Sequence, residues 1–163
     1  MIKLWRTGGH CYCNVTFAGL PSISLNCIQS VMNASARLVC GSRKYDHITP
    51  LLRDQLHWLK VPERITYKLC LLVYKCIHGI GPAYLCDFII PVSTIASRQR
   101  LRSSKSLNVL VPSTNLRVGE RAFRVAAPIA WNNLPYDVQN ANTIASFKRL
   151  LKTFLFKKCY FNN

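Results

Sequence analysis

The chain has 163 residues, half of them hydrophobic, and 22 Lys and Arg stand against six Asp and Glu, which gives a net charge of +16. This length suits one domain with a sizeable core, and no apolar run approaches the roughly 20 residues that span a bilayer. Such an excess of positive charge repels itself unless it meets an anion. RNA or DNA is therefore the expected partner, with a solvated basic surface as the alternative, and neither a membrane nor a small-molecule substrate is expected.

The cysteines are expected to be buried free thiols. Six of the eight lie in or beside apolar helical patterns, and these are Cys27, Cys40, Cys70, Cys76, Cys86 and Cys159. Met1–Arg6 lacks the apolar middle of a signal peptide, so we expect an intracellular protein, in the nucleus or the cytoplasm, without disulfides. The nearest approaches to paired metal ligands are His10-Cys11-x-Cys13, which is too cramped, and Cys76-x-His78. No metal and no cofactor are expected.

The first long element in chain order is a predicted helix that begins after the break at Gly19–Ser22 and ends at Gly41. Its apolar residues recur at helical spacing and are expected to form one face: Leu25, Ile28, Val31, Ala34, Leu38 and Val39. Arg37, Arg43 and Lys44 gather at its C-terminal end. Favourable interaction with the helix dipole and contact with phosphate explain them equally well.

A short helix is predicted next, with Thr49 as its N-cap and Pro50 as its first residue. It is expected to bury three leucines: Leu51, Leu52 and Leu56. His47 and His57 flank it, and because no carboxylate lies at a catalytic spacing from either, both are interpreted as core or capping residues.

Val61–Arg64 begins a longer predicted helix that ends before Gly79 and Gly81-Pro82, and another short helix is expected at Ala83–Ile89. The apolar positions that define the longer helix are Ile65, Leu69, Leu72, Val73 and Ile77.

The composition then changes at Ser97–Ser106, which has four positive charges, no acid and many serines. This segment lacks the periodicity needed to pack, so an exposed loop is predicted. Arg and Ser are common phosphate donors, so the loop is the first predicted nucleic-acid contact. Its candidate residues are Arg98, Arg100, Arg102 and Lys105. A linker whose charge is incidental is the alternative.

A short strand at Leu107–Val111 is predicted to pair with Leu116–Val118 in a hairpin. In the stretch Gly119–Pro135 that follows, Pro128 is expected to break or restart a helix. The predicted apolar face of that helix consists of Ala122, Val125, Ala126 and Ile129, with Phe123 beside them. The residues assigned a structural role are Phe123, Pro128, Trp131 and Pro135.

The clearest amphipathic helix closes the chain, with apolar positions at Ile144, Phe147, Leu150, Leu151, Phe154 and Leu155. Its other face and end carry the second predicted set of phosphate contacts, which is Lys148, Arg149, Lys152, Lys157 and Lys158. The predicted fold class is therefore mainly α: a small bundle of about five to six helices with at most one hairpin, near 107–118. One domain is expected over 11–158, between an unmatched segment at 1–10 and a tail at 159–163.

The stretch Arg121–Pro135 reads Arg-Ala-Phe-x-Val-Ala-Ala-Pro-x-x-Trp-Asn-x-Leu-Pro. It resembles the C-terminal region of non-LTR retrotransposon reverse transcriptases of the LINE-type, jockey-like group. Further similar blocks follow the family's order from about Cys13 to Lys158, among them Ala18–Pro21, Asp46–Leu52, Leu56–Leu59, Val61–Ile65, Arg100–Ser103 and Ser146–Thr153. The family's arginines in the 112–115 turn are replaced here by Ser113 and Asn115.

The resemblance implies a region that follows the polymerase palm, where template RNA or target DNA passes. The palm needs paired aspartates that hold two metal ions, and none of the six acids here is adjacent to another or one residue away from it. The expected function is thus a non-catalytic fragment of such a polyprotein that binds the RNA or DNA backbone as an accessory domain. The alternative is a degenerate remnant that acts only as a structural or protein-interaction module.

Overall fold

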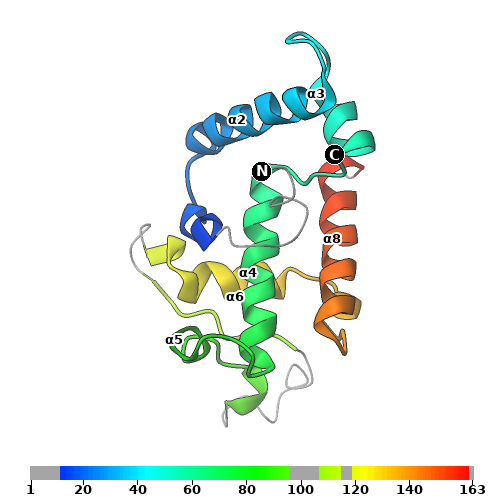
Figure 1. Ribbon diagram of the computed structural model, residues 1–163. Helices are drawn as coiled ribbons and strands as arrows, with labels where there is room; N and C mark the ends of the chain where they lie inside the picture. Colours follow the sequence, from blue (N-terminus) through cyan, green and yellow to red (C-terminus); the bar gives the residue numbers. More distant parts are fainter. Residues whose placement is uncertain (1–11, 96–106, 115–118, 162–163) are drawn as a thin grey trace.

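The structure, a computed structural model, describes residues 12–95, 107–114 and 119–161 (Figure 1). Within these ranges there are seven α-helices, three of which have only three or four residues, and no β-strand. The mainly helical fold class is therefore confirmed. The elements are η1 (Tyr12–Phe17), α2 (Ser22–Cys40), α3 (Ile48–Pro50), η2 (Leu51–Gln55), α4 (Val61–Ile77), α5 (Ala83–Cys86), η3 (Val92–Thr94), η6 (Gly119–Arg121), α6 (Phe123–Asn132), α7 (Tyr136–Gln139) and α8 (Ile144–Tyr160).

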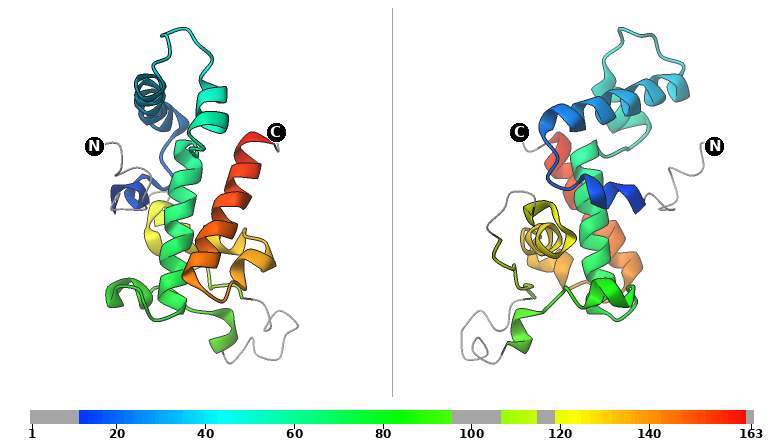
Figure 2. Two further views of the ribbon diagram at one scale, coloured as in Figure 1. Left: turned by 45° about the vertical axis from the view of Figure 1, so that its right-hand side comes forward. Right: turned by 90° about the vertical axis from the view of Figure 1, so that its left-hand side faces the viewer.

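Helix α4 is the centre of the molecule, and α2, α5, α6, α8 and η1 all contact it. Pro62 lies in its first turn, where the missing N–H costs nothing, and both predicted ends hold. In Figure 1, α8 runs beside α4 in the opposite direction and α6 crosses it. Figure 2 shows the crossing from the side, with α6 viewed almost along its axis. The three helices therefore enclose one core.

Aromatic side chains from all three helices meet in this core. The rings of Tyr74 and Phe147 stack with centroids 4.3 Å apart, and those of Trp131 and Phe147 are 5.7 Å apart. The Tyr74 hydroxyl donates to the carbonyl oxygen of Ala141 at 2.9 Å, so this buried phenol has its hydrogen-bond partner. These contacts join α4 to α8 and to the α7–α8 connection.

Helix α6 corrects two predictions. It is continuous through Pro128, which is fully buried, so the expected break or restart was wrong. Burial against neighbouring elements outweighs the loss of one backbone hydrogen bond, and at the end of the helix the Asn133 N–H donates to the Ile129 oxygen at 3.3 Å. The buried face was also misassigned, because Ala122 and Ile129 are exposed. The residues that α6 buries are Val125, Ala127, Pro128 and Trp131.

Helix α2 has the predicted ends, and Gly41 closes it in the left-handed conformation with φ 64°. Its predicted apolar face was wrong, however, because Val31 is 67% and Leu38 is 84% exposed. The helix instead turns Met32 and Ala36 into the core, with Leu25 and Ile28 beside them. Because α2 has apolar residues around much of its circumference, spacing alone did not identify the side that meets η2 and α4.

The short helix between α2 and α4 begins earlier than predicted. The N-cap position of α3 is occupied by His47, not Thr49, and Pro50 ends this helix before the wider turn of η2. Leu51 and Leu52 are buried and Leu56 is half-buried, as expected for a core-facing turn. Both histidines are exposed, so neither is a core residue. His57 instead donates from Nδ1 to the Arg53 carbonyl oxygen at 2.7 Å, which is a capping contact.

The segment 107–110 pairs with residues 90–92, a partner that was not predicted. Val109 forms an antiparallel bridge with Pro91, and the Leu110 N–H donates to the Ile90 oxygen at 2.8 Å. The predicted partner, 116–118, lies outside the described residues. Helix α5 ends at Cys86, three residues before the predicted end.

The domain extends beyond its predicted limit at residue 158. Helix α8 continues to Tyr160, and Cys159 is buried against the core. The last turn therefore belongs to the domain and not to the predicted tail.

Candidate nucleic-acid interface

The five predicted cations of the last helix all lie on α8 and are all exposed. The helix begins at an N-cap, Thr143, whose hydroxyl accepts a hydrogen bond from the Ser146 N–H at 3.2 Å. Its apolar residues recur every four positions and are buried, namely Phe147, Leu151, Leu155 and Cys159. Burial of this stripe fixes the rotation of the helix and so directs its basic residues into solvent.

These cations fall into two groups along the helix. Lys148, Arg149 and Lys152 occupy its first half, and Lys157 and Lys158 lie in its last turn. With a rise of about 1.5 Å per residue, Arg149 and Lys157 are roughly 12 Å apart along the axis. The two groups therefore present charge at separate places, and we call the first group the α8 basic face.

The second group lies beside further basic residues that sequence reasoning missed. Around the last turn of α8, cations from η2, from the N-cap position of α4 and from α4 itself lie over aromatic rings: Arg53 over Phe161 at 5.9 Å, Lys60 over Tyr160 at 5.4 Å, and Arg64 over Trp58 at 5.3 Å. We call these residues, with Lys157 and Lys158, the aromatic–basic cluster. Alternating cations and rings suit nucleic acid, since cations meet phosphates and rings meet bases.

Hydrogen bonds hold this cluster in place. The Tyr160 hydroxyl donates to the Trp58 carbonyl oxygen at 2.6 Å, and Arg64 Nε donates to the Leu59 oxygen at 2.8 Å. Burial raises the pKa of Tyr160 well above its usual value, so the phenol keeps the proton that it donates. Trp58 and Tyr160 are 102 positions apart in sequence, so a local sequence pattern could not predict that these residues meet.

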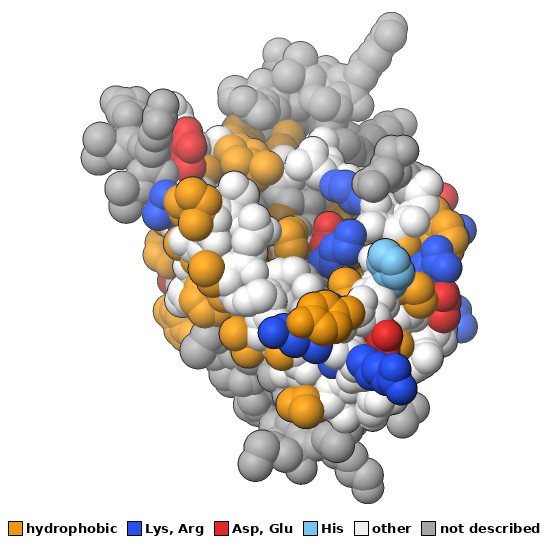
Figure 3. All heavy atoms as spheres, turned by 90° about the horizontal axis from the view of Figure 1, so that it is seen from above, with side chains coloured by type: hydrophobic (Ala, Val, Ile, Leu, Met, Phe, Trp, Pro, Cys, Tyr) orange, Lys and Arg blue, Asp and Glu red, His pale blue; other side chains and the backbone are white. Residues whose placement is uncertain are grey.

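Little of the basic charge is neutralised within the part of the chain that the structure describes. One salt bridge occurs there, between Arg53 Nε and Asp54 Oδ1 at 2.7 Å, and it is solvent-exposed. The hydrogen bond from Arg53 holds the pKa of Asp54 below its usual value. Figure 3 views the face that carries α2 and shows Lys and Arg side chains at separate places, several of them beside Asp or Glu side chains, with apolar side chains between. The positive charge on this face is thus dispersed and does not form one continuous patch.

The basic residues in and after the last turn of α2 differ in their contacts. Arg37 Nη2 donates to the Asp46 carbonyl oxygen at 3.3 Å, which supports a structural role for this side chain. Lys44 lies over the ring of exposed Tyr45 at 5.7 Å, and Arg43 is also exposed. Arg43 and Lys44 remain open to phosphate, whereas Arg37 is already engaged.

The predicted loop residues Arg98, Arg100, Arg102 and Lys105 lie outside the described residues. The segment that follows them is firmly anchored. The Trp131 indole N–H donates to the Leu107 oxygen at 2.8 Å. The amide of Asn132 both accepts from the Val109 N–H and donates to the Val109 oxygen, each at 2.9 Å. The Asn132 side chain thus satisfies both backbone groups of Val109, as the backbone of a neighbouring strand would. The sequence did not predict this role.

The residues assigned a structural role are placed as follows. Trp131 and Pro128 are buried and Phe123 is half-buried against the core. Pro135 is exposed and occupies the N-cap position of α7 with φ −60° and ψ 148°, where its fixed φ suits the start of the helix. Its role is local and does not involve the core.

Two of the buried cysteines have pKa values that disfavour the reactive thiolate. Burial raises the pKa of Cys70 to about 12, and burial together with a hydrogen bond from the Cys76 thiol to Cys86 raises that of Cys76 to about 12. Cys159 is also buried, but Cys40 and Cys86 are half-buried and Cys27 is exposed, so the expectation of burial holds for only three of the six. Among the described residues, no three His, Cys, Asp or Glu side chains gather as a metal would require.

None of the helices in the described ranges has the length and apolar character to cross a membrane. No protein-family model, no curated protein and no solved structure matches the chain.

Proposed function

We propose that this protein is a non-catalytic module that binds the phosphate backbone of RNA or DNA, and that it derives from the post-palm region of a LINE-type reverse transcriptase. The observation that carries the proposal is the exposed, unneutralised charge of α8, which lies on a rigid helix and ends in the aromatic–basic cluster. The sequence resemblance at Arg121–Pro135 supports the origin, and the net charge of +16 supports the ligand.

The salt dependence of binding tests this function. Each phosphate contact releases counterions, so log affinity falls with log salt by about 0.7 to 0.9 per contact. Replacing the three residues of the α8 basic face by Ser should flatten this slope by about two to three units. The same change at Arg98, Arg100, Arg102 and Lys105 should flatten it by about three units if all four touch phosphate.

A matched control separates contact from net charge. Arg121→Ser/Arg124→Ser removes two exposed cations from η6 and α6, and for each cation removed it should change the slope less than the α8 variant does. Absence of binding at low salt would refute the proposal. A slope that responds equally, for each cation removed, to the α8 and control variants would refute the assignment of the site to α8.

A second function is favoured by a specific observation on α2. The large apolar side chains exposed on this helix, Ile23, Val31 and Leu38, resemble a protein-contact face more than a solvated one. A remnant that acts as a protein-interaction module would use this face and would not need the cations. Binding to nucleic acid that is lost with the α8 variant, but not with Val31→Ser/Leu38→Ser, would decide for the first function.

A further inference from the structure

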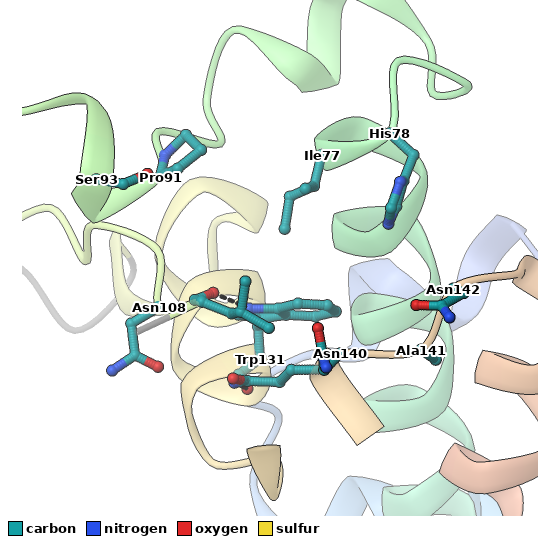
Figure 4. A pocket seen from close by; sticks show the side chains of 11 residues that line it. Ile77, His78, Pro91, Ser93, Asn108, Trp131, Asn140, Ala141 and Asn142 are labelled. Atoms are coloured by element: carbon teal, nitrogen blue, oxygen red, sulfur yellow. Dashed lines mark hydrogen bonds between the residues drawn. The ribbon is translucent and has the colours of Figure 1, made fainter. Parts of the chain in front are cut away.

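A pocket of about 420 Å³ opens between the C-terminal end of α4, the segment 107–108 and the α7–α8 connection (Figure 4). Its volume falls in the range of about 300–1,000 Å³ that is typical of ligand sites. It lies apart from the aromatic–basic cluster, which is built around the opposite end of α4. Nothing in the function proposed above uses this pocket.

The walls of the pocket suit a flat ligand. Figure 4 shows Ile77 and His78 on one side and the indole of Trp131 facing them across the space. The ring of Trp131 is held by the hydrogen bond from its N–H to the Leu107 oxygen, 2.8 Å. Ile77, the last residue of α4, continues the apolar spacing of the helix but is exposed, and it borders this space. The indole itself is buried, so the surfaces open to a ligand are Ile77 and the imidazole of His78, against which a planar group can lie.

The rim of the pocket carries amides that have unused hydrogen-bonding capacity. Asn108, Asn140 and Asn142 contribute to the lining, and their side chains make no hydrogen bond with other described residues. Each amide offers one acceptor oxygen and two donor hydrogens. The lining includes no Lys, Arg, Asp or Glu. The ligand is therefore neutral, planar and able both to donate and to accept hydrogen bonds.

Cations adjoin this neutral pocket. Asn142 stands two positions before Ile144, where α8 begins, and the α8 basic face starts at Lys148, one turn further. A planar, hydrogen-bonding group that is joined to negative charge matches the pocket and the cations of α8, and a nucleotide within a strand has this chemistry.

We propose that the pocket binds one unstacked base of single-stranded RNA or DNA, with the adjoining backbone on the α8 basic face. The proposal rests on the function proposed above and adds a preference for single strands. Unpaired bases can be splayed out, stacked on aromatic rings and bonded at their edges by polar side chains. In a duplex the bases are paired and stacked, so only backbone contacts remain.

The test measures the affinities of the full chain, by fluorescence anisotropy, for three ligands of equal length: a single strand, the same strand with abasic sites, and a duplex. The intact single strand should bind at least about fivefold more tightly than its abasic counterpart. Asn140→Ala/Asn142→Ala should remove most of this difference and leave duplex affinity unchanged. Ile77→Trp, which fills the space, should have the same effect without loss of an amide.

Asn26→Ala/Asn133→Ala is the matched control, because it removes two exposed amides that lie outside the pocket. It should preserve the base-dependent difference. Equal affinity of the wild-type chain for intact and abasic strands would overturn the pocket assignment and leave backbone binding intact. If none of the three ligands binds at low salt, the proposed function itself fails. Tight binding of a free nucleoside monophosphate that displaces the strand would assign the pocket to a mononucleotide instead.

Discussion

Helices α4 and α2 have similar lengths, 17 and 19 residues, and both show apolar residues at helical spacing. Yet α4 buries eight side chains and α2 buries two. The difference lies in their surroundings, since α4 is contacted by five other elements and α2 only by α3, η2 and α4 among the larger contacts. Apolar periodicity thus predicts that a helix forms, while the number of neighbours decides how much of it is buried.

The largest effect on stability is expected when a buried side chain is removed from the core around α4. Trp131→Ala should lower the free energy of unfolding by about 3–5 kcal/mol, because the indole is 2% exposed and its loss leaves a cavity. The loss also removes the hydrogen bond to Leu107. Urea unfolding followed by circular dichroism measures the effect. An unchanged melting temperature with abolished nucleic-acid binding would show that Trp131 is mainly a stacking residue.

The buried thiol of Cys70 on α4 predicts a loss of stability at alkaline pH. Burial raises its pKa from about 9 to about 12 in the folded state. A raised pKa favours the protonated form in the fold, so this stabilisation is fully present below pH 9 and is lost as the pH rises from 9 to 12. The expected contribution is about 1.4 kcal/mol per pH unit in that window.

Unfolding at several alkaline pH values would measure this slope in the wild type and in Cys70→Ala. The variant should show a shallower slope above pH 9, whatever its stability at neutral pH. Cys27→Ala is the matched control, because this thiol is exposed on α2. Equal slopes in the wild type and Cys70→Ala would assign the alkaline loss to other groups.

A smaller effect on stability is expected from substitutions at the glycines that follow α2 and α4. Gly41 after α2 and Gly79 after α4 have φ values of 64° and 68°, and a Cβ added to either would meet nothing within 4 Å. Gly41→Ala and Gly79→Ala should each cost about 1–2 kcal/mol, because an L-residue is strained in the left-handed region. Asn tolerates this conformation better, so Gly41→Asn should cost less. If Ala is harmless at both sites, the left-handed caps do not persist in solution.

The sequence predicted those features that depend on local chemistry. The ends of α2 and α4 and the buried stripe of α8 follow from Gly41, Pro62 and regular apolar spacing. Features that depend on distant partners were not predictable. Asn132 pairs with Val109, 23 positions away, and Tyr160 bonds to Trp58, 102 positions away. Both α2 and α6 were assigned the wrong face for the same reason, since several of their faces are apolar and only the position of α4 decides between them.

The smallest effect is predicted for the exposed apolar side chains of α2. Val31→Ser and Leu38→Ser remove large apolar groups that are already in water, so each should change the free energy of unfolding by no more than about 0.5 kcal/mol. Leu69→Ala on α4 is the buried counterpart, 4% exposed, and should cost about 2–5 kcal/mol. Urea unfolding of the three variants at one protein concentration gives the comparison. A cost above about 1 kcal/mol for Leu38→Ser would mean that this face is covered in solution, and repeating the measurement at several protein concentrations would then show whether a second copy covers it.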